Sequence, residues 1–286
     1  MLYVFLSICC SVIVSVMLKL ARRYQIDIYQ AITWNYSIAI LLTWFFFKPQ
    51  LQGLQNAPYV NYLVLGVLLP FLFVIIAFSV RITGIVRTDI AQRLSLFIPV
   101  VASFLLFSEQ LSAGKIAGIV LAFTAIGFSI PQQDKNNYHR TPAKGWLYLL
   151  LVFAGMGVID ILFKQIAAFK EVPYTTSLLL VYIVSFVFAI IGLVYRFATK
   201  RSVFSWPHIM FGWILGVANF GNILFYLKAH RALSVTPSAV FAAMNIGVIV
   251  LGSLVGLFVF KEKLSLLNKI GIGVAIVAIV AIYYVV

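Results

Sequence analysis

Long runs of apolar residues, separated by short polar connections, make up nearly the whole chain of 286 residues. Each run is about 20 residues long, which is enough for an α-helix to cross a hydrocarbon core of about 30 Å. Because an open sheet edge leaves backbone groups unsatisfied in lipid, the runs predict helices, and the chain is predicted to be an all-α integral membrane protein. We place ten transmembrane helices near positions 2–20, 30–47, 59–80, 88–107, 113–130, 145–165, 175–195, 208–228, 235–260 and 266–286.

The composition supports this pattern and narrows the possible functions. Hydrophobic residues make up 63% of the chain and charged residues only 10%, against roughly a quarter charged in soluble proteins. The connections are too short for a soluble catalytic or nucleotide-binding domain, and no Walker-type glycine loop is present. We therefore expect no enzyme activity and no cofactor. The first run has no basic residues before it and no cleavage site after it, so we expect a retained helix.

The net charge of +14 is expected to serve membrane topology rather than nucleic-acid binding. Most Lys and Arg residues fall in connections that follow odd-numbered spans. The positive-inside rule would then place both termini outside the cytoplasm. We expect a multi-pass protein of the plasma (inner) membrane whose partners are a small-molecule substrate and membrane lipids, and such a bundle can act as a monomer.

Each half of the chain contains the same short sequence motif, called the phrase below, before its last predicted helix. The segment Phe107–Ser112 reads FSEQLS and the segment Phe260–Ser265 reads FKEKLS. In each half a glycine, Gly118 or Gly271, follows nine residues after the glutamate. Further matched pairs are separated by slowly growing distances, as small insertions would produce: Lys19 with Lys164 (145), Arg81 with Arg231 (150) and Glu109 with Glu262 (153).

This duplication predicts two inverted five-helix repeats. Residues 1–130 form the first repeat, residues 145–286 the second, and the polar stretch 131–144 joins them. Because five spans is an odd number, the second copy enters the membrane from the opposite side. Inverted repeats are a recurrent design of secondary transporters, in which closing one side opens the other. A duplicated structural bundle without transport is the alternative.

Ten spans in two fives, with a Glu-x-Leu-Ser phrase before the last helix of each half, resemble the drug/metabolite transporter superfamily and within it the EamA-type members. The resemblance covers essentially the whole chain. It implies a carrier for small metabolites, often an exporter of amino acids or similar compounds, without a bound cofactor. One position departs from the repeat: Pro99, ten residues before Glu109, has Gly252 as its counterpart, so a helix break there would have to come from glycine in the second half.

Asp160 is the carboxylate in the middle of a predicted span, where it costs roughly 2.5–3.5 kcal/mol on insertion scales. Lys164 lies one helical turn further on the same face. The two residues could form an internal ion pair that positions the helix. Alternatively, Asp160 could carry a proton during transport.

Polar side chains on several spans form a candidate substrate cavity. Asn219, Asn222 and Tyr226 are spaced three and four apart and share one face of the eighth span. Asn245 on the ninth span and Asn35 with Tyr36 on the second could complete it. Such amides either join helices or line a cavity that binds an amino acid or another small polar metabolite.

Further charged positions have competing interpretations. Arg93, next to Gln92 at the start of the fourth span, could bind a substrate carboxylate or anchor to lipid head groups. Glu109 and Glu262 each precede a helix, and we expect them to cap free backbone N–H groups at a tight turn. Gly118 and Gly271 would then allow close helix packing.

The end of the eighth span, with Lys228, His230 and Arg231, is expected to form a solvated, lipid-facing edge. The three histidines have no Cys or carboxylate at metal-ligand spacing, so we expect no metal site. The favoured function is a secondary transporter, exporting a small polar or amphipathic metabolite such as an amino acid by alternating access. The alternative is a membrane-embedded enzyme that acts on a lipid-linked substrate, which would need clustered acid, base or metal-binding residues.

Overall fold

The computed structural model describes residues 1–50, 54–83, 85–110, 112–129, 143–261 and 266–285. These residues form helices without any strand, so the prediction of an all-α protein is confirmed. The predicted linker 131–144 and the Glu262–Ser265 part of the second phrase lie almost wholly or wholly outside the described residues. The helices are α1 (Leu2–Arg23), α2 (Ile28–Phe47), the 3-10 turn η1 (Leu54–Asn56), α3 (Tyr59–Thr83), α4 (Ile85–Leu94), α5 (Phe97–Leu105), α6 (Ala113–Ser129), α7 (Ala143–Ala168), α8 (Tyr174–Ala198), α9 (Trp206–Ala232), α10 (Pro237–Phe258) and α11 (Leu266–Val285).

Seven stretches of the described chain are long and apolar enough to cross a membrane. They correspond to α1, α3, the pair α4 and α5 taken together, α7, α8, α9 and α10. Shorter apolar helices occupy Ala113–Phe128 and Lys269–Ala278. The chain is therefore a multi-pass helical protein of membrane type, and large apolar side chains such as Phe45, Leu105 and Trp206 are exposed on its surface as lipid contact requires.

The fourth apolar run, predicted as one span, is broken in two. The break falls at Ser95 and Leu96, between α4 and α5. Pro99 explains it, because a proline has no N–H to donate and its ring clashes with the carbonyl four residues earlier, which belongs to Ser95. In the second half, α10 runs unbroken through Gly252, the counterpart of Pro99, so the glycine does not break the helix there.

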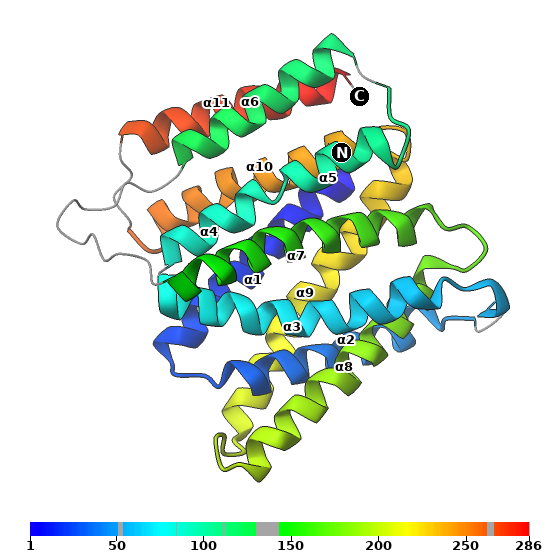
Figure 1. Cartoon of the computed structure of the whole chain (residues 1–286), viewed down its shortest axis with the longest axis vertical. Coiled ribbons are helices and arrows are strands. Elements are labelled where there is room, and N and C mark those ends of the chain that lie inside the picture. The colour runs from blue at the N-terminus through cyan, green and yellow to red at the C-terminus, as the bar shows by residue number, and fades with distance from the viewer. Residues whose placement is uncertain (51–53, 84, 111, 130–142, 262–265, 286) are drawn as a thin grey trace.

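The helices are stacked in successive layers (Figure 1). The helices α6 and α11 pack side by side at one edge, and α10 lies next to them with α4 and α5. The helices α7 and α3 follow, and α2 and α8 pack together at the opposite edge, while α1 and α9 pack on each other and cross the stack obliquely. Gly118 and Gly271 are both buried, on α6 and α11, where small side chains such as Ala122 and Ala275 let these two helices approach.

Two glycines one turn apart let α9 approach α2 closely. A Cβ atom added at Gly212 would lie 2.7 Å from the backbone oxygen of Ala31, and one added at Gly216 would lie 2.6 Å from that of Asn35. Since helices in lipid gain little from hydrophobic burial against each other, such backbone proximity supplies much of their packing energy. Gly216 therefore fixes the contact between the second and the ninth helices.

We expect Gly216→Ala to lower the stability of the protein by about 1–3 kcal/mol, because the new methyl group overlaps backbone atoms that cannot rotate away. Thermal denaturation in detergent measures the change. Gly192→Ala on α8 is the matched control, because a Cβ atom there meets nothing within 4 Å. Equal melting temperatures for the two variants would contradict this account of the α2–α9 contact.

Candidate functional site

The carboxylate of Asp160 on α7 binds a tyrosine rather than the lysine on its own helix. The Tyr226 hydroxyl on α9 donates a hydrogen bond of 2.8 Å to Asp160 Oδ1. Asp160 and Lys164 form no ion pair, so the predicted internal pair is wrong. Both side chains point from α7 toward the carboxyl-terminal part of α9. Asp160 binds Tyr226 there, and Lys164 binds the backbone of Ser234. Asp160 therefore connects α7 to α9.

Lys164 lies at the carboxyl end of α9. It is 2% exposed, and its Nζ donates a hydrogen bond of 3.0 Å to the backbone oxygen of Ser234, just beyond the last turn of the helix. The carboxyl end of a helix carries free carbonyl groups and the negative end of the dipole, so a cation is stabilised there. The ammonium also lies 5.8 Å from the ring centre of Phe107, at the outer limit of a cation–π contact.

Glu109 caps a helix, as expected, but not the helix that follows it. Its carboxylate accepts hydrogen bonds from the backbone N–H of Ser238 (2.9 Å) and from the Ser238 hydroxyl (2.7 Å), in the first turn of α10. Lys115 Nζ lies 3.1 Å from the same carboxylate, whose side chain is fully buried. The cap of α6 is the hydroxyl of Ser112, which accepts from the N–H of Lys115 at 3.3 Å. Glu109 thus connects the first half of the chain to the second.

His230 is the functional candidate that the sequence interpretation missed. It lies in the last turn of α9 and is 0% exposed, so the expected solvated edge is wrong at this position. Its ring lies between those of Tyr226, at 4.6 Å, and Phe241, at 4.7 Å. Neither ring nitrogen has a hydrogen-bond partner. The helical period could have identified it, because His230 continues the stripe of Asn219, Asn222 and Tyr226 by one more turn.

These residues form one buried polar cluster where α7, α9 and α10 meet the α5–α6 connection. We call it the α9–α10 cluster, and it consists of Glu109, Lys115, Asp160, Lys164, Tyr226 and His230. The charge of Lys164 acts electrostatically on both Glu109 and His230, so the three groups are neighbours. Charged groups buried in a membrane-spanning bundle are costly and mark functional positions.

The predicted amides do not all converge on this cluster. Asn222 accepts a hydrogen bond of 2.8 Å from Ser7 and so joins α9 to α1. Asn245 donates to the backbone of Phe241 on its own helix. Asn219 is buried and makes no side-chain hydrogen bond within the described residues. Of the three, Asn219 is the one whose amide makes no hydrogen bond with the described residues, whereas Asn222 and Asn245 each use one group of the amide.

A second group of unsatisfied polar atoms lies on α2 and α8. Asn35 Oδ1 and the hydroxyls of Tyr36, Tyr182 and Ser185 are buried and have no hydrogen-bond partner. Tyr36 and Tyr182 lie close enough to interact electrostatically. Because unsatisfied buried polar atoms are rare and cost free energy, this group is a place where water or a polar ligand would be stabilised.

The two predicted residues on α4 lie elsewhere. Arg93 Nε donates to Asp89 Oδ2 at 2.7 Å, one turn earlier on the same partly exposed helix. Arg93 therefore binds the carboxylate of Asp89 on its own helix. Gln92 is half-buried beside it.

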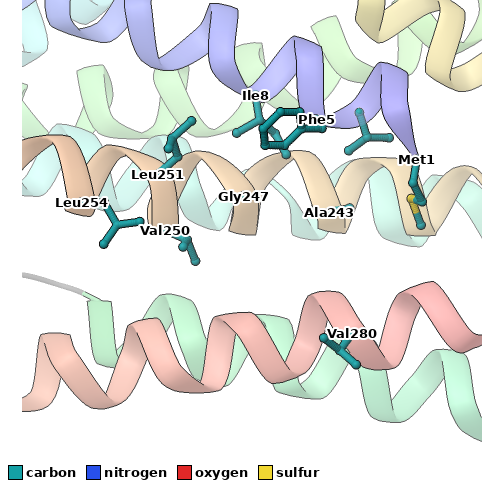
Figure 2. A pocket seen from close by; sticks show the side chains of 10 residues that line it. Met1, Phe5, Ile8, Ala243, Gly247, Val250, Leu251, Leu254 and Val280 are labelled. Atoms are coloured by element: carbon teal, nitrogen blue, oxygen red, sulfur yellow. The ribbon is translucent and has the colours of Figure 1, made fainter.

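Between α1, α10 and α11 lies a cavity of about 520 Å³. Figure 2 shows its apolar lining, with Phe5 and Ile8 from α1, Leu251 from α10 and Val280 from α11. It contains none of the predicted site residues. Within the part of the chain that the structure describes, no three His, Cys, Asp or Glu side chains gather as potential metal ligands.

We expect Glu109→Gln to lower the free energy of unfolding by about 1–3 kcal/mol, because a neutral amide cannot hold both Lys115 and the N–H of Ser238. Thermal unfolding in detergent measures the loss. Glu171→Gln, at an exposed position in the α7–α8 connection, is the control and should leave stability unchanged. An unaltered melting temperature for Glu109→Gln would rule out the carboxylate as the link to α10.

The comparisons with known proteins bear on family and fold. No protein-family model matches the chain. A crystal structure of a protein that is 13% identical in sequence matches with a TM-score of 0.76, over 99% of this chain and 96% of the other, so the fold is one already seen in a solved structure. A protein of Haemophilus influenzae, described as an uncharacterized protein, is 44% identical over 285 residues, which span 97% of this chain and 96% of the relative. At this identity over nearly the full length of both, the chain belongs to the same protein family as the Haemophilus influenzae protein.

Proposed function

We propose that the chain is a secondary transporter that moves a small polar or amphipathic metabolite, such as an amino acid, by alternating access. In this proposal α1, α2, α3, the pair α4 and α5, and α6 form five spans. The helices α7, α8, α9, α10 and α11 form five more in the opposite orientation. The substrate site lies between the two repeats, and export from the cell across the plasma (inner) membrane is the favoured direction.

The observation that carries the proposal is the order in which the helices pack. The contact of α2 with α9 has a counterpart in the contact of α8 with α3. In the same way α1 packs on α9 and on α10, while α7 packs on α3 and on α4 with α5. The helices α6 and α11, which would be exchanged by a twofold axis, pack on each other, and so do α2 and α8. This set of contacts is what two inverted repeats would produce.

Side-chain contacts support the same relation. Lys164 lies over Phe107, from the first phrase, and Lys19 lies over Phe260, from the second, at 3.8 Å from the ring centre. These lysines and these aromatic residues are the pairs that the sequence repeat aligns. The two contacts differ in length, 5.8 Å against 3.8 Å. A transporter that opens one side at a time would give its two ends different geometries in any one state.

The polar groups inside the bundle support transport over a purely structural role. Asp160, Lys164 and His230 lie within apolar spans. A polar or charged group without a full set of partners costs free energy there, so such residues are typical of functional sites. The rings of Tyr226 and Phe241 contact His230, and the ring of Phe163 packs on Tyr226. A site with a few charges and apolar walls suits a small amphipathic solute.

The test is uptake and counterflow in proteoliposomes that contain the purified chain. The panel contains radiolabelled amino acids, nucleosides and organic anions, and protein-free liposomes give the background. Saturable, protein-dependent movement of at least one solute is the expected result. If no solute moves faster than in empty liposomes, the transport proposal is wrong.

We expect Asp160→Asn to reduce accumulation of the substrate against its gradient at least tenfold and to leave substrate exchange unchanged. The reason is that an amide keeps the hydrogen bond with Tyr226 but cannot take up and release a proton. Proteoliposomes with an imposed proton gradient measure accumulation, and preloaded vesicles measure exchange. Glu171→Gln is the control carboxylate outside the bundle. Uphill transport at the wild-type level in Asp160→Asn would exclude Asp160 as the proton carrier.

A further inference from the structure

Lys164 is a buried cation with unused hydrogen-bonding capacity. An ammonium has three N–H donors, and the backbone oxygen of Ser234 accepts the one hydrogen bond that Lys164 makes with the described residues. Its carboxylate neighbour Glu109 is already held by Lys115 and by two donors of Ser238. Lys164 therefore shares the charge of Glu109 with Lys115, and its other neighbours are a neutral carbonyl and a distant aromatic ring, which together compensate a buried charge only in part.

His230 next to it is also incompletely satisfied. Both ring nitrogens are buried and without a partner, although in either neutral tautomer one of them is an N–H donor. Aromatic rings cover the imidazole on two sides, so it has no access to solvent from there. A buried donor without an acceptor is unfavourable, and in native proteins it indicates a missing partner.

A single type of chemical group would satisfy both Lys164 and His230. It must accept hydrogen bonds from an ammonium and from an imidazole N–H, and a negative charge would compensate Lys164. A carboxylate has two acceptor oxygens and a single charge. Two carboxylates, Asp160 and Glu109, already lie in the cluster, so a doubly charged group such as phosphate would be repelled more strongly than a monoanion.

We propose that Lys164 and His230 form a subsite for the carboxylate group of the transported substrate. This inference rests on the proposed function and specifies it: the substrate is a carboxylic acid whose apolar remainder packs against Phe163, Tyr226 and Phe241. In the conformation described here both groups are sealed from solvent. In the alternating-access cycle of the proposed function, the carboxylate reaches them in a conformation in which α7, α9 and α10 separate, and it supplies the acceptor oxygens that the closed cluster lacks.

The experiment uses the full chain purified in detergent and two probes of the same shape, phenylacetate and phenylacetamide. Thermal denaturation is recorded with increasing amounts of each, at constant ionic strength set with sodium chloride. Phenylacetate is expected to raise the melting temperature in a saturable way, and the neutral amide is expected to bind at least tenfold more weakly. Equal stabilisation by acid and amide, or by chloride alone, would overturn the proposal, as would no stabilisation by phenylacetate.

Variants identify the residues. Lys164→Gln and His230→Gln should each weaken phenylacetate binding at least tenfold, whereas Lys170→Gln, which removes an exposed lysine beyond the end of α7, should bind as the wild type does. Wild-type affinity in Lys164→Gln would place the carboxylate elsewhere. Since the comparison of acid with amide needs no variant, it decides the question even if Lys164→Gln does not fold.

The outcome is independent of the transport assay. If phenylacetate binds through Lys164 but no solute moves in proteoliposomes, the transport proposal fails, and Lys164 and His230 remain a carboxylate-binding site without a transport role. If solutes are transported at unchanged rates by Lys164→Gln, transport stands and the subsite fails. Each result therefore decides one of the two proposals.

Discussion

Backbone N–H and C=O groups in a lipid environment must find their hydrogen-bond partners inside the protein, and the structure follows from this requirement. Helices satisfy it along their length but leave free groups at both ends. The described chain places charged side chains where such ends are buried. Lys164 binds the carbonyl just beyond α9, and Glu109 binds the first turn of α10. The charges of the α9–α10 cluster thus have a structural role, beside the binding role that we propose for them.

The members of the cluster differ in how completely their hydrogen-bonding groups are satisfied. Glu109 has a full set of partners and holds α10 to the connection between α5 and α6. In the same cluster, Lys164 is only partly satisfied and His230 is unsatisfied. A ligand that supplies an anion to them gains favourable contacts without displacing the contacts of Glu109. In the transport cycle that we propose, this site would bind and release a solute while the helices remain connected.

Close packing of small residues positions the cluster. Gly212 and Gly216 bring α9 against α2, and alanines bring α6 against α11. Because lipid tails are as apolar as leucine, side-chain burial alone would not select these partners. Backbone proximity fixes the rotation of α9, and this rotation points Tyr226 toward Asp160 and His230 toward Phe241. Gly212 and Gly216 lie on the same side of α9 as its polar residues, nearer the start of the helix, so their contact with α2 sets the direction of the polar face.

The sequence by itself determined the helical class and most helix positions, because runs of about 20 apolar residues have one stable form in lipid. It also identified Asp160, Lys164 and Tyr226 as residues of interest, since polar groups in such runs stand out. It could not determine their partners. The spacing of four residues made an ion pair between Asp160 and Lys164 possible. Each side chain instead binds a group that the packing of α7 against α9 places near it. Only the tertiary structure decided that Tyr226 takes Asp160, that Glu109 caps α10, and that His230 is enclosed, because each depends on how α7, α9 and α10 pack.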